Sequence, residues 1–387
     1  MAPSFPLSRL LLPKVHVTPD EQRLSKEMMN TMLEHTVQAF ENFAYDGQGI
    51  VDMARWKQLG GQDGLKLYRE RVAGDTSSGL VAALGSGAML ANSDSVAALA
   101  APTMMMTGCC PGSVANAMSA AISLTQDDLS LLVNFMHEDV ADCAVLKTME
   151  SPTPEEPYHY LGYKYFVRKS PGAPGLVKHR DSLYLEFSGT ATTKQGELLG
   201  FVLLHSVNVP EFPDLTKYNC IRALQSVRFL YRQRSHEVVE VFMLGNMDVL
   251  GMVINPIADK LTQMTVFALV QLTDCAEAKK LTHMVRDRRP SVLVRSRHRD
   301  SNNCQLCNKT PKKGTLLISG SSQLIKCEVC GCFACATCRD IKKIYVANPD
   351  HILGKFQKGA MYTRLMELND VAEQTSAYLS SRSRRMP

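Results

Sequence analysis

The pattern of apolar positions first becomes regular near the N-terminus. Thr18-Pro-Asp-Glu21 supplies an N-cap, a proline at the first helical position and a glutamate three residues after the cap. Apolar residues then recur at roughly helical spacing through about residue 43, at Leu24, Met28, Leu33, Val37 and Phe40. This pattern predicts a long amphipathic helix with one face on the core.

Strand-like runs dominate the middle of the chain. The early ones cover residues 64–72, 103–109 and 139–149. Four or five more follow at hairpin spacing, over 158–169, 182–191, 197–207, 221–233 and 237–244. The alternation is clean in places, and Leu183, Leu185 and Phe187 should share one face. Residues 74–100, rich in Gly, Ala and Ser, read as a long flexible insertion.

Two further helices are predicted. Ser113 caps a short Ala-rich helix through residue 122. Asn255-Pro256 opens a long helical pattern that continues to about residue 288. A helix, several antiparallel strands and a long final helix predict an α+β fold in which a curved sheet surrounds the C-terminal helix. Such a sheet can enclose a hollow for an apolar ligand or a filled core, and the Phe, Leu, Val and Met content suits both.

Charge is distributed unevenly along the 387 residues. The net charge is +5, but from Arg286 onward 19 Lys and Arg face 8 Asp and Glu, which leaves +11 there and −6 before it. A basic C-terminal part favours an anionic partner, either a membrane surface or a nucleic acid, unless it is only a solvated surface. Six arginines form its most basic run: Arg286, Arg288, Arg289, Arg295, Arg297 and Arg299.

No membrane-spanning or secretory segment is predicted. The chain contains no run of 18 apolar residues, and prolines interrupt the leucines at positions 10–12. We therefore expect a cytoplasmic protein in a reducing compartment, where cysteine pairs bind metal more often than they form disulfides.

The cysteines carry the clearest chemical signal. Seven of the twelve lie between residues 304 and 338, and six of these form C-x-x-C pairs. Two thiolates two residues apart can share one tetrahedral Zn²⁺, and four complete a closed structural site. The predicted zinc ligands are Cys304, Cys307, Cys327, Cys330, Cys335 and Cys338.

The residues alone leave the pairing open. A zinc ribbon would join 304/307 with 327/330. However, the segment from Cys330-Gly331 to Cys338 resembles the C-G-x-x-x-C-x-x-C core of FYVE-type zinc fingers. That resemblance implies a crossed arrangement, which we favour: the pairs 304/307 and 335/338 form one full site, and 327/330 form half of a second. No cysteine follows Cys338, so the second site lacks its last pair.

The finger also departs from lipid-binding FYVE fingers at their basic motif. Those fingers carry an arginine and histidine run around the third cysteine, which clamps the phosphate of phosphatidylinositol 3-phosphate. Only Lys326 remains here, and Glu328 follows the cysteine. A phosphate monoester needs several converging donors, so specific recognition of that lipid is not expected.

Over roughly residues 15–345 the sequence resembles the START-like/FYVE-finger proteins that are numerous in oomycetes. The resemblance is carried by Trp56-Lys-Gln, Tyr68-Arg-Glu-Arg71, Glu138-Asp-Val-Ala-Asp-Cys-Ala-Val-Leu146, Arg180-Asp-Ser-Leu-Tyr-Leu-Glu186, His205-Ser-Val-Asn-Val-Pro210, Glu237-Val-Val-Glu-Val-Phe-Met243 and Ala278-Lys-Lys-Leu-Thr-His-Met-Val285. It implies a helix-grip START-like domain with a cavity for a lipid or other apolar molecule. The expected domains are an extension (1–17), the START-like domain (18–290), a basic linker (291–300), the finger (301–346) and a partly disordered tail (347–387).

Together these features predict a non-catalytic lipid-binding or lipid-shuttling protein, or a membrane adaptor. The finger, Lys326 and the arginine run would dock it on an anionic membrane, endosomal or other, or on a protein partner. The alternative is a protein-interaction adaptor with a filled core and no lipid. Nucleic-acid binding is disfavoured because the arginine run lacks interleaved aromatics. No catalytic motif surrounds His137 or His205-Ser206, and a site closed by thiolates activates no water.

Overall fold

The computed structural model describes residues 4–71, 102–137, 139–169, 178–248, 271–287, 303–310, 324–348 and 351–362. Four predicted features lie at least partly outside these residues. They are the insertion at 74–100, the first part of the long helix before residue 271, the basic segment from Arg288 to Arg299, and the tail after residue 362.

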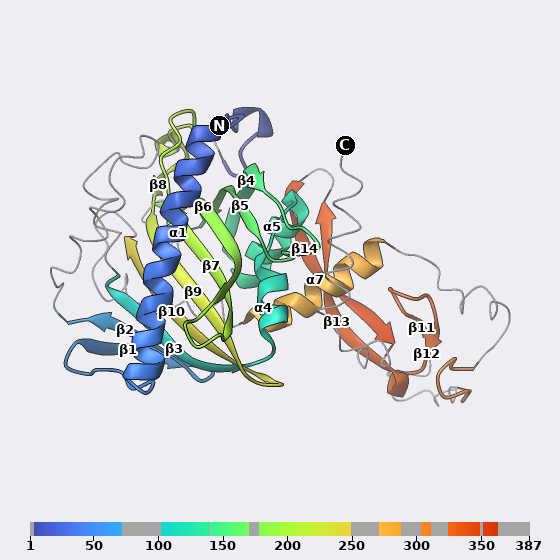
Figure 1. Cartoon of the computed structure of the whole chain (residues 1–387). Helices are drawn as coiled ribbons and strands as arrows, with labels where there is room; N and C mark the ends of the chain where they lie inside the picture. Colours follow the sequence, from blue (N-terminus) through green and yellow to red (C-terminus); the bar gives the residue numbers. More distant parts are fainter. Residues whose placement is uncertain are drawn as a thin grey trace.

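Ten strands of the described residues form one antiparallel sheet (Figure 1), in the order β1-β2-β3-β10-β9-β7-β6-β5-β4, with the short β8 parallel to β6. Every predicted strand run in the described residues finds a place in it. The strands are β1 (Trp56–Gln62), β2 (Leu65–Glu70), β3 (Met104–Pro111), β4 (Val140–Glu150), β5 (Tyr160–Arg168), β6 (His179–Thr192), β7 (Leu198–Ser206), β8 (Cys220–Arg222), β9 (Leu224–Ser235) and β10 (Val238–Asp248).

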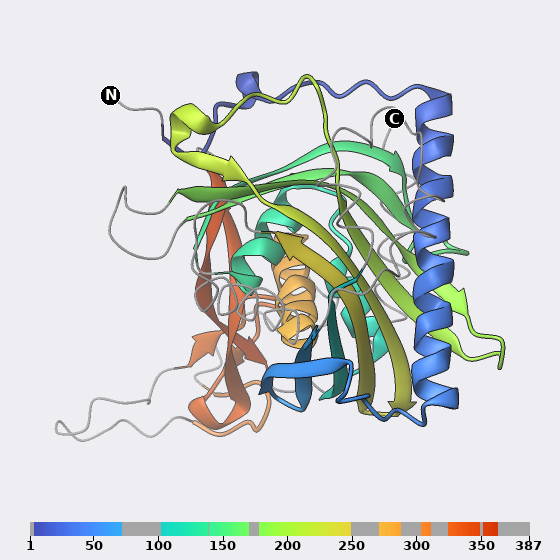
Figure 2. The same ribbon diagram turned by 90° about the vertical axis from the view of Figure 1, so that its left-hand side faces the viewer.

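Helix α1 (Pro19–Glu41) covers one face of this sheet, as Figure 2 shows. Its predicted capping box is confirmed: the Thr18 hydroxyl accepts the Glu21 N–H, and the Glu21 carboxylate accepts the Thr18 N–H at 2.8 Å. The predicted alternation in β6 is confirmed too. Its three odd-numbered apolar residues join the buried residues of α1 in one core cluster, which includes Met29, Met32, Leu183, Leu185 and Phe187.

Helices α4 (Val114–Ala121), α5 (Gln126–Met136) and α7 (Leu272–Arg286) cover the opposite face (Figure 2). Helix α4 and the end of α7 agree with the helices predicted from sequence. Helix α5 was not predicted; Thr125 caps it by accepting the Asp128 N–H. Close packing fixes α4 on the sheet, because a Cβ on Gly200 of β7 would lie 2.7 Å from the Met118 sulfur. The predicted α+β fold, a curved antiparallel sheet that grips a C-terminal helix, is confirmed.

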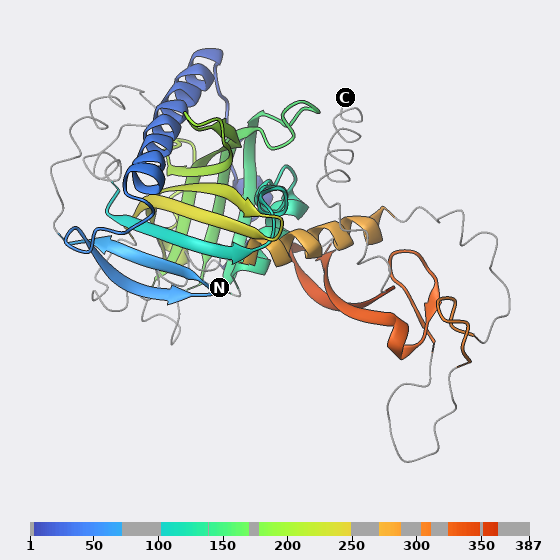
Figure 3. The same cartoon turned by 60° about the horizontal axis from the view of Figure 1, so that its bottom comes forward.

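The C-terminal part adds four strands: β11 (Ile325–Lys326), β12 (Phe333–Ala334), β13 (Arg339–Asn348) and β14 (His351–Tyr362). Strands β13 and β14 pair as a twisted hairpin that extends beside α7 (Figure 3). The expected boundary between finger and tail at residue 346 falls inside this hairpin. Regular structure continues to residue 362, where β14 ends, because β14 pairs with β13 along its length.

Candidate metal centre and buried polar site

The first cysteine pair lies on a tight turn that aims both sulfurs at one point. The Asn308 N–H donates to the Cys304 carbonyl at 2.8 Å, and the Cys304 N–H donates to the Lys309 carbonyl at 2.9 Å. Asn308 has a φ of 55°, in the left-handed region that asparagine tolerates better than most residues. The backbone thus holds Cys304 and Cys307 in a fixed geometry.

The third pair meets the first. The Cys335 N–H donates to the Cys304 sulfur at 3.3 Å, and the sulfurs of Cys307 and Cys335 are 3.9 Å apart. All four sulfurs of Cys304, Cys307, Cys335 and Cys338 lie within 4.8 Å of one another. Four thiolates on a tetrahedral Zn²⁺ are about 3.8 Å apart, given Zn–S bonds of about 2.3 Å. The donor set therefore fits such an ion, and the crossed arrangement is the one that the structure brings together.

Backbone N–H groups favour the ionised form of Cys304, one of the four candidate ligands. Burial opposes ionisation of Cys304, but the N–H groups of Cys307, Cys335 and Leu306 outweigh it and lower the thiol pKa to about 6. Because a thiolate is the form that binds metal, the surroundings of Cys304 favour ligation by this sulfur near neutral pH. At Cys338, burial and the neighbouring sulfurs raise the thiol pKa to about 12.

The second pair, Cys327 and Cys330, forms the same kind of turn but is not part of the four-cysteine group. The Gly331 N–H donates to the Cys327 carbonyl at 3.0 Å, the Cys327 N–H donates to the Cys332 carbonyl at 2.8 Å, and Gly331 has a φ of 76°. Cys327 is buried in an apolar cluster with Leu281 of α7 and Ile344 of β13. In the part of the chain that the structure describes, the four-cysteine group is the only metal-type cluster.

Two of the predicted membrane-contact residues are described. Arg286 ends α7 and lies 3.6 Å from Asp127 and 3.7 Å from Asp287. Lys326 is exposed on β11, opposite the exposed Phe333 of β12. The finger thus shows one basic and one aromatic side chain together on its surface.

The structure also reveals a buried ion pair that the sequence analysis missed. Lys164 of β5 and Glu186 of β6 are both buried, and the lysine Nζ lies 2.6 Å from the Glu186 Oε1. The same ammonium lies 4.2 Å from the centre of the Tyr160 ring. Burial lowers the pKa of Lys164, although the Glu186 carboxylate opposes the shift.

The register of the sheet places this pair on the face covered by α4, α5 and α7. Glu186 pairs with Leu204 of β7, and Leu204 pairs with Val227 of β9. Directly opposed residues of antiparallel strands share a face, and Val227 belongs to the core cluster that contains α4 and α7. The ion pair therefore points into the interior between sheet and helices.

Further charged groups line the same interior from the helices. His283 of α7 contacts the Asp128 carboxylate of α5 at 2.7 Å. Lys279 of α7 donates to the carbonyls of Ser119 and Ile122 at the end of α4. Burial lowers the pKa of His283, although the Asp128 carboxylate opposes this shift. Burial alone would raise the pKa of Asp128, but His283 and Lys279 outweigh it, so the pKa of Asp128 is lowered.

The two histidines of the sequence segments without a catalytic motif, His137 and His205, lie in packed surroundings. His205 is buried, and its Nδ1 lies 3.1 Å from the Ser226 hydroxyl. His137 stacks on Phe166 with ring centroids 6.1 Å apart. Burial lowers the pKa of His205 to about 4 and that of His137 to about 3, which makes both poor proton acceptors at neutral pH.

No described helix is long and apolar enough to cross a membrane.

No family model and no curated protein matches the chain. Among solved structures, human STARD10 shows 11% identity and a TM-score of 0.37, over 63% of this chain and 82% of its own. Human StAR-related lipid transfer protein 5 shows 12% and 0.41, over 67% and 98%. A STAR-related lipid transfer protein fragment from Xanthomonas axonopodis shows 14% and 0.35, over 58% and 99%. Similarities this loose assign no ligand to the chain.

Proposed function

We propose that this chain is a non-catalytic lipid-binding protein whose interior, between the sheet and helices α4, α5 and α7, takes an apolar ligand with a polar group. The observation that carries the proposal is the buried pair of Lys164 and Glu186 on the inner face of the sheet. The ligand's polar group would bind at this pair, and its apolar part would lie along the surrounding apolar side chains.

A buried ion pair carries a desolvation penalty that a purely structural role seldom offsets. Removing two charges from water costs several kcal/mol per ion, and apolar replacements of similar volume are often neutral or stabilising. Lysine offers three donors and a carboxylate about four acceptor positions, so the pair has hydrogen-bonding capacity beyond its 2.6 Å contact. A hydroxyl or a head group could use that capacity where water is excluded.

The finger would bring this body to an anionic membrane from the cytoplasm. Cys304, Cys307, Cys335 and Cys338 would hold a structural Zn²⁺ in a FYVE-like module. Lys326 and each arginine of the run that starts at Arg286 would add about 1 kcal/mol of attraction to an anionic leaflet, screened by salt. The exposed Phe333 beside Lys326 would suit the interfacial region.

One observation favours the alternative, an adaptor with a filled core. Lys164, Tyr160 and Tyr184 of the inner face are each at most 4% exposed, so neighbouring side chains already enclose them. In that case the finger surface alone would carry function, through a protein partner.

Native mass spectrometry of the full chain separates the two functions. The protein is incubated with vesicles of phosphatidylcholine, phosphatidylserine and cholesterol and then re-purified. We expect one bound lipid per chain, which the double variant Lys164→Met/Glu186→Leu loses. The matched control Arg23→Met/Glu27→Leu, which removes an exposed ion pair of 3.0 Å on α1, should keep it. A clean apo mass for the wild type would overturn lipid binding. Flotation with anionic and neutral vesicles tests docking, and equal binding to both would exclude the electrostatic part.

A further inference from the structure

Helix α7 has one face in the core of the body and another under the C-terminal hairpin. On the inner side, Leu272, Cys275 and Ala276 belong to the core cluster between helices and sheet. Lys279 and His283 tie the same helix to α4 and α5. The position of α7 therefore determines how the interior is closed on that side.

The hairpin of β13 and β14 grips the outer side of α7. Lys342 forms an ion pair of 3.0 Å with Glu277, and the Tyr345 N–H donates to the Thr282 hydroxyl at 2.8 Å. Ile344 packs on Leu281 in the cluster that also buries Cys327. An ion pair, a buried hydrogen bond and an apolar contact thus join the finger to successive turns of the helix.

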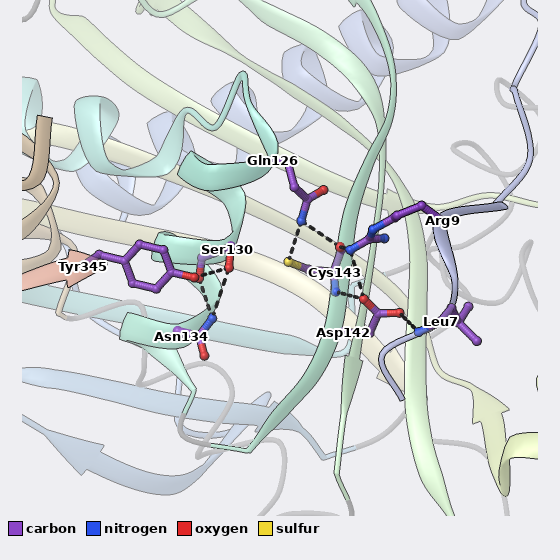
Figure 4. A network of polar contacts seen from close by, with 8 residues as sticks. All are labelled: Leu7, Arg9, Gln126, Ser130, Asn134, Asp142, Cys143 and Tyr345. Carbon is purple, nitrogen blue, oxygen red and sulfur yellow. Dashed lines mark hydrogen bonds and ion pairs between the residues drawn. The ribbon is translucent and has the colours of Figure 1, made fainter. Parts of the chain in front are cut away.

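Tyr345 extends this grip to α5, and α5 in turn contacts β4, as Figure 4 shows. Its hydroxyl is hydrogen-bonded to the Ser130 hydroxyl of α5 and accepts the Gly354 N–H of β14. Its ring packs against Phe356 with centroids 5.3 Å apart, and Phe356 meets Phe135 of α5 at 5.4 Å. The same turns of α5 reach β4, where the Gln126 side chain donates to the Cys143 carbonyl at 2.9 Å.

The four-cysteine group lies at the root of this hairpin. Cys335 and Cys338 bracket a single 3-10 turn, and β13 begins at the next residue, Arg339. The other two ligands, Cys304 and Cys307, come from a separate segment of the chain. A metal held by all four would therefore tie the start of the hairpin to this second segment, where hydrogen bonds between Gln305 and Phe333 also join the two. Its loss would weaken that attachment.

We propose that the metal-bound finger is a latch that holds α7 against the interior, so that metal loss loosens α7 and lowers retention of the ligand. The ligand part rests on the proposed function; the effect on α7 does not. The latch is an intramolecular control on the binding site, driven by occupancy of the four-cysteine group.

Hydrogen-exchange mass spectrometry of the full chain tests the latch directly. We compare the zinc-loaded protein with the variant Cys335→Ser, and use Cys109→Ser, an exposed cysteine of β3, as the control. Amides of α7 should exchange about tenfold faster in Cys335→Ser, as loss of even one or two net hydrogen bonds produces. Amides of β6 and β7 should stay unchanged, and Cys109→Ser should match the wild type.

A second variant avoids disturbing the finger itself. Lys342→Ala/Tyr345→Phe keeps every cysteine but removes the ion pair to Glu277 and the hydroxyl contact to Ser130. It should bind zinc at the wild-type ratio and still show faster exchange in α7. If α7 exchanges at the wild-type rate in both variants, the latch is wrong.

Lipid retention is measured on the same samples by native mass spectrometry. Faster α7 exchange with a several-fold loss of bound lipid supports the latch as a control on the site. Faster α7 exchange with unchanged lipid retention would overturn the idea that the latch controls the ligand site. If the wild type holds no lipid, the proposed function fails, and α7 exchange alone still decides whether the finger positions this helix.

Discussion

Replacing Lys164 by methionine should be among the most damaging changes to the body. The substitution keeps the volume but leaves the Glu186 carboxylate buried without the ammonium that now lies 2.6 Å away. Breaking one side of a buried pair costs about 3–5 kcal/mol. In a domain of about 150–250 residues each kcal/mol shifts Tm by about 2–4 °C, so we expect Tm to fall by about 6–20 °C.

The double variant Lys164→Met/Glu186→Leu should recover most of this loss, because no uncompensated charge remains. The single variants should also differ in their pH dependence. With Lys164 gone, the carboxylate becomes tolerable when it is protonated, so the penalty shrinks as pH falls. With Glu186→Leu, burial already lowers the Lys164 pKa, so the ammonium loses its proton and the penalty shrinks as pH rises.

Urea unfolding followed by circular dichroism between pH 5 and pH 9 measures all four proteins of this cycle. A double variant whose loss of stability equals the sum of the two single losses would show that the residues act independently. Equal stability of wild type and Lys164→Met would refute the placement of the pair in a water-excluded interior.

Four further outcomes follow from the structure. The free energy of unfolding should fall as pH drops below about 6.5, because His205 takes up its proton near pH 6.5 in the unfolded chain but only near its folded pKa of about 4 in the native protein. The loss of stability should reach about 3 kcal/mol once both states are protonated. Urea unfolding of His205→Gln should show a weaker dependence on pH. Tyr345→Phe should cost about 1–3 kcal/mol in thermal unfolding, since Ser130 and the Gly354 N–H lose a buried partner. Elemental analysis should find one zinc per chain, lost in Cys338→Ser and kept in Cys332→Ser; two per chain would contradict the single complete site. Gly200→Ala should lower Tm, because its Cβ would press on Met118.

Local rules were enough to predict much of the fold. The capping box at Thr18 and the alternation through Leu183 and Phe187 depend on neighbours in sequence, so the sequence alone shows them. The C-x-x-C pairs are equally local, but their spacing left the pairing open. The resemblance to FYVE-type fingers implied the four cysteines that the structure brings together. Helix α5 has a capping residue, Thr125, but its apolar face is short and was not recognised.

The buried pair depends on tertiary structure. Lys164 and Glu186 meet only because β5 and β6 pair in one register and helices cover that face. A charged residue among the aromatic positions of β5 was the available signal, but alternation alone does not say which face is closed to water. The docking of the hairpin is equally non-local, since Tyr345 finds Ser130 and Thr282 far away in sequence.

The seating of the C-terminal hairpin has a practical consequence for anyone who divides this chain. A fragment cut at the basic linker after residue 290 would end just beyond α7 and lack the hairpin that packs on this helix. Leu281 and Phe135 would lose their contacts with Ile344 and Phe356, and Thr282 would lose its buried donor. Such a fragment should self-associate at concentrations where the intact protein remains monodisperse, because newly exposed apolar patches promote aggregation.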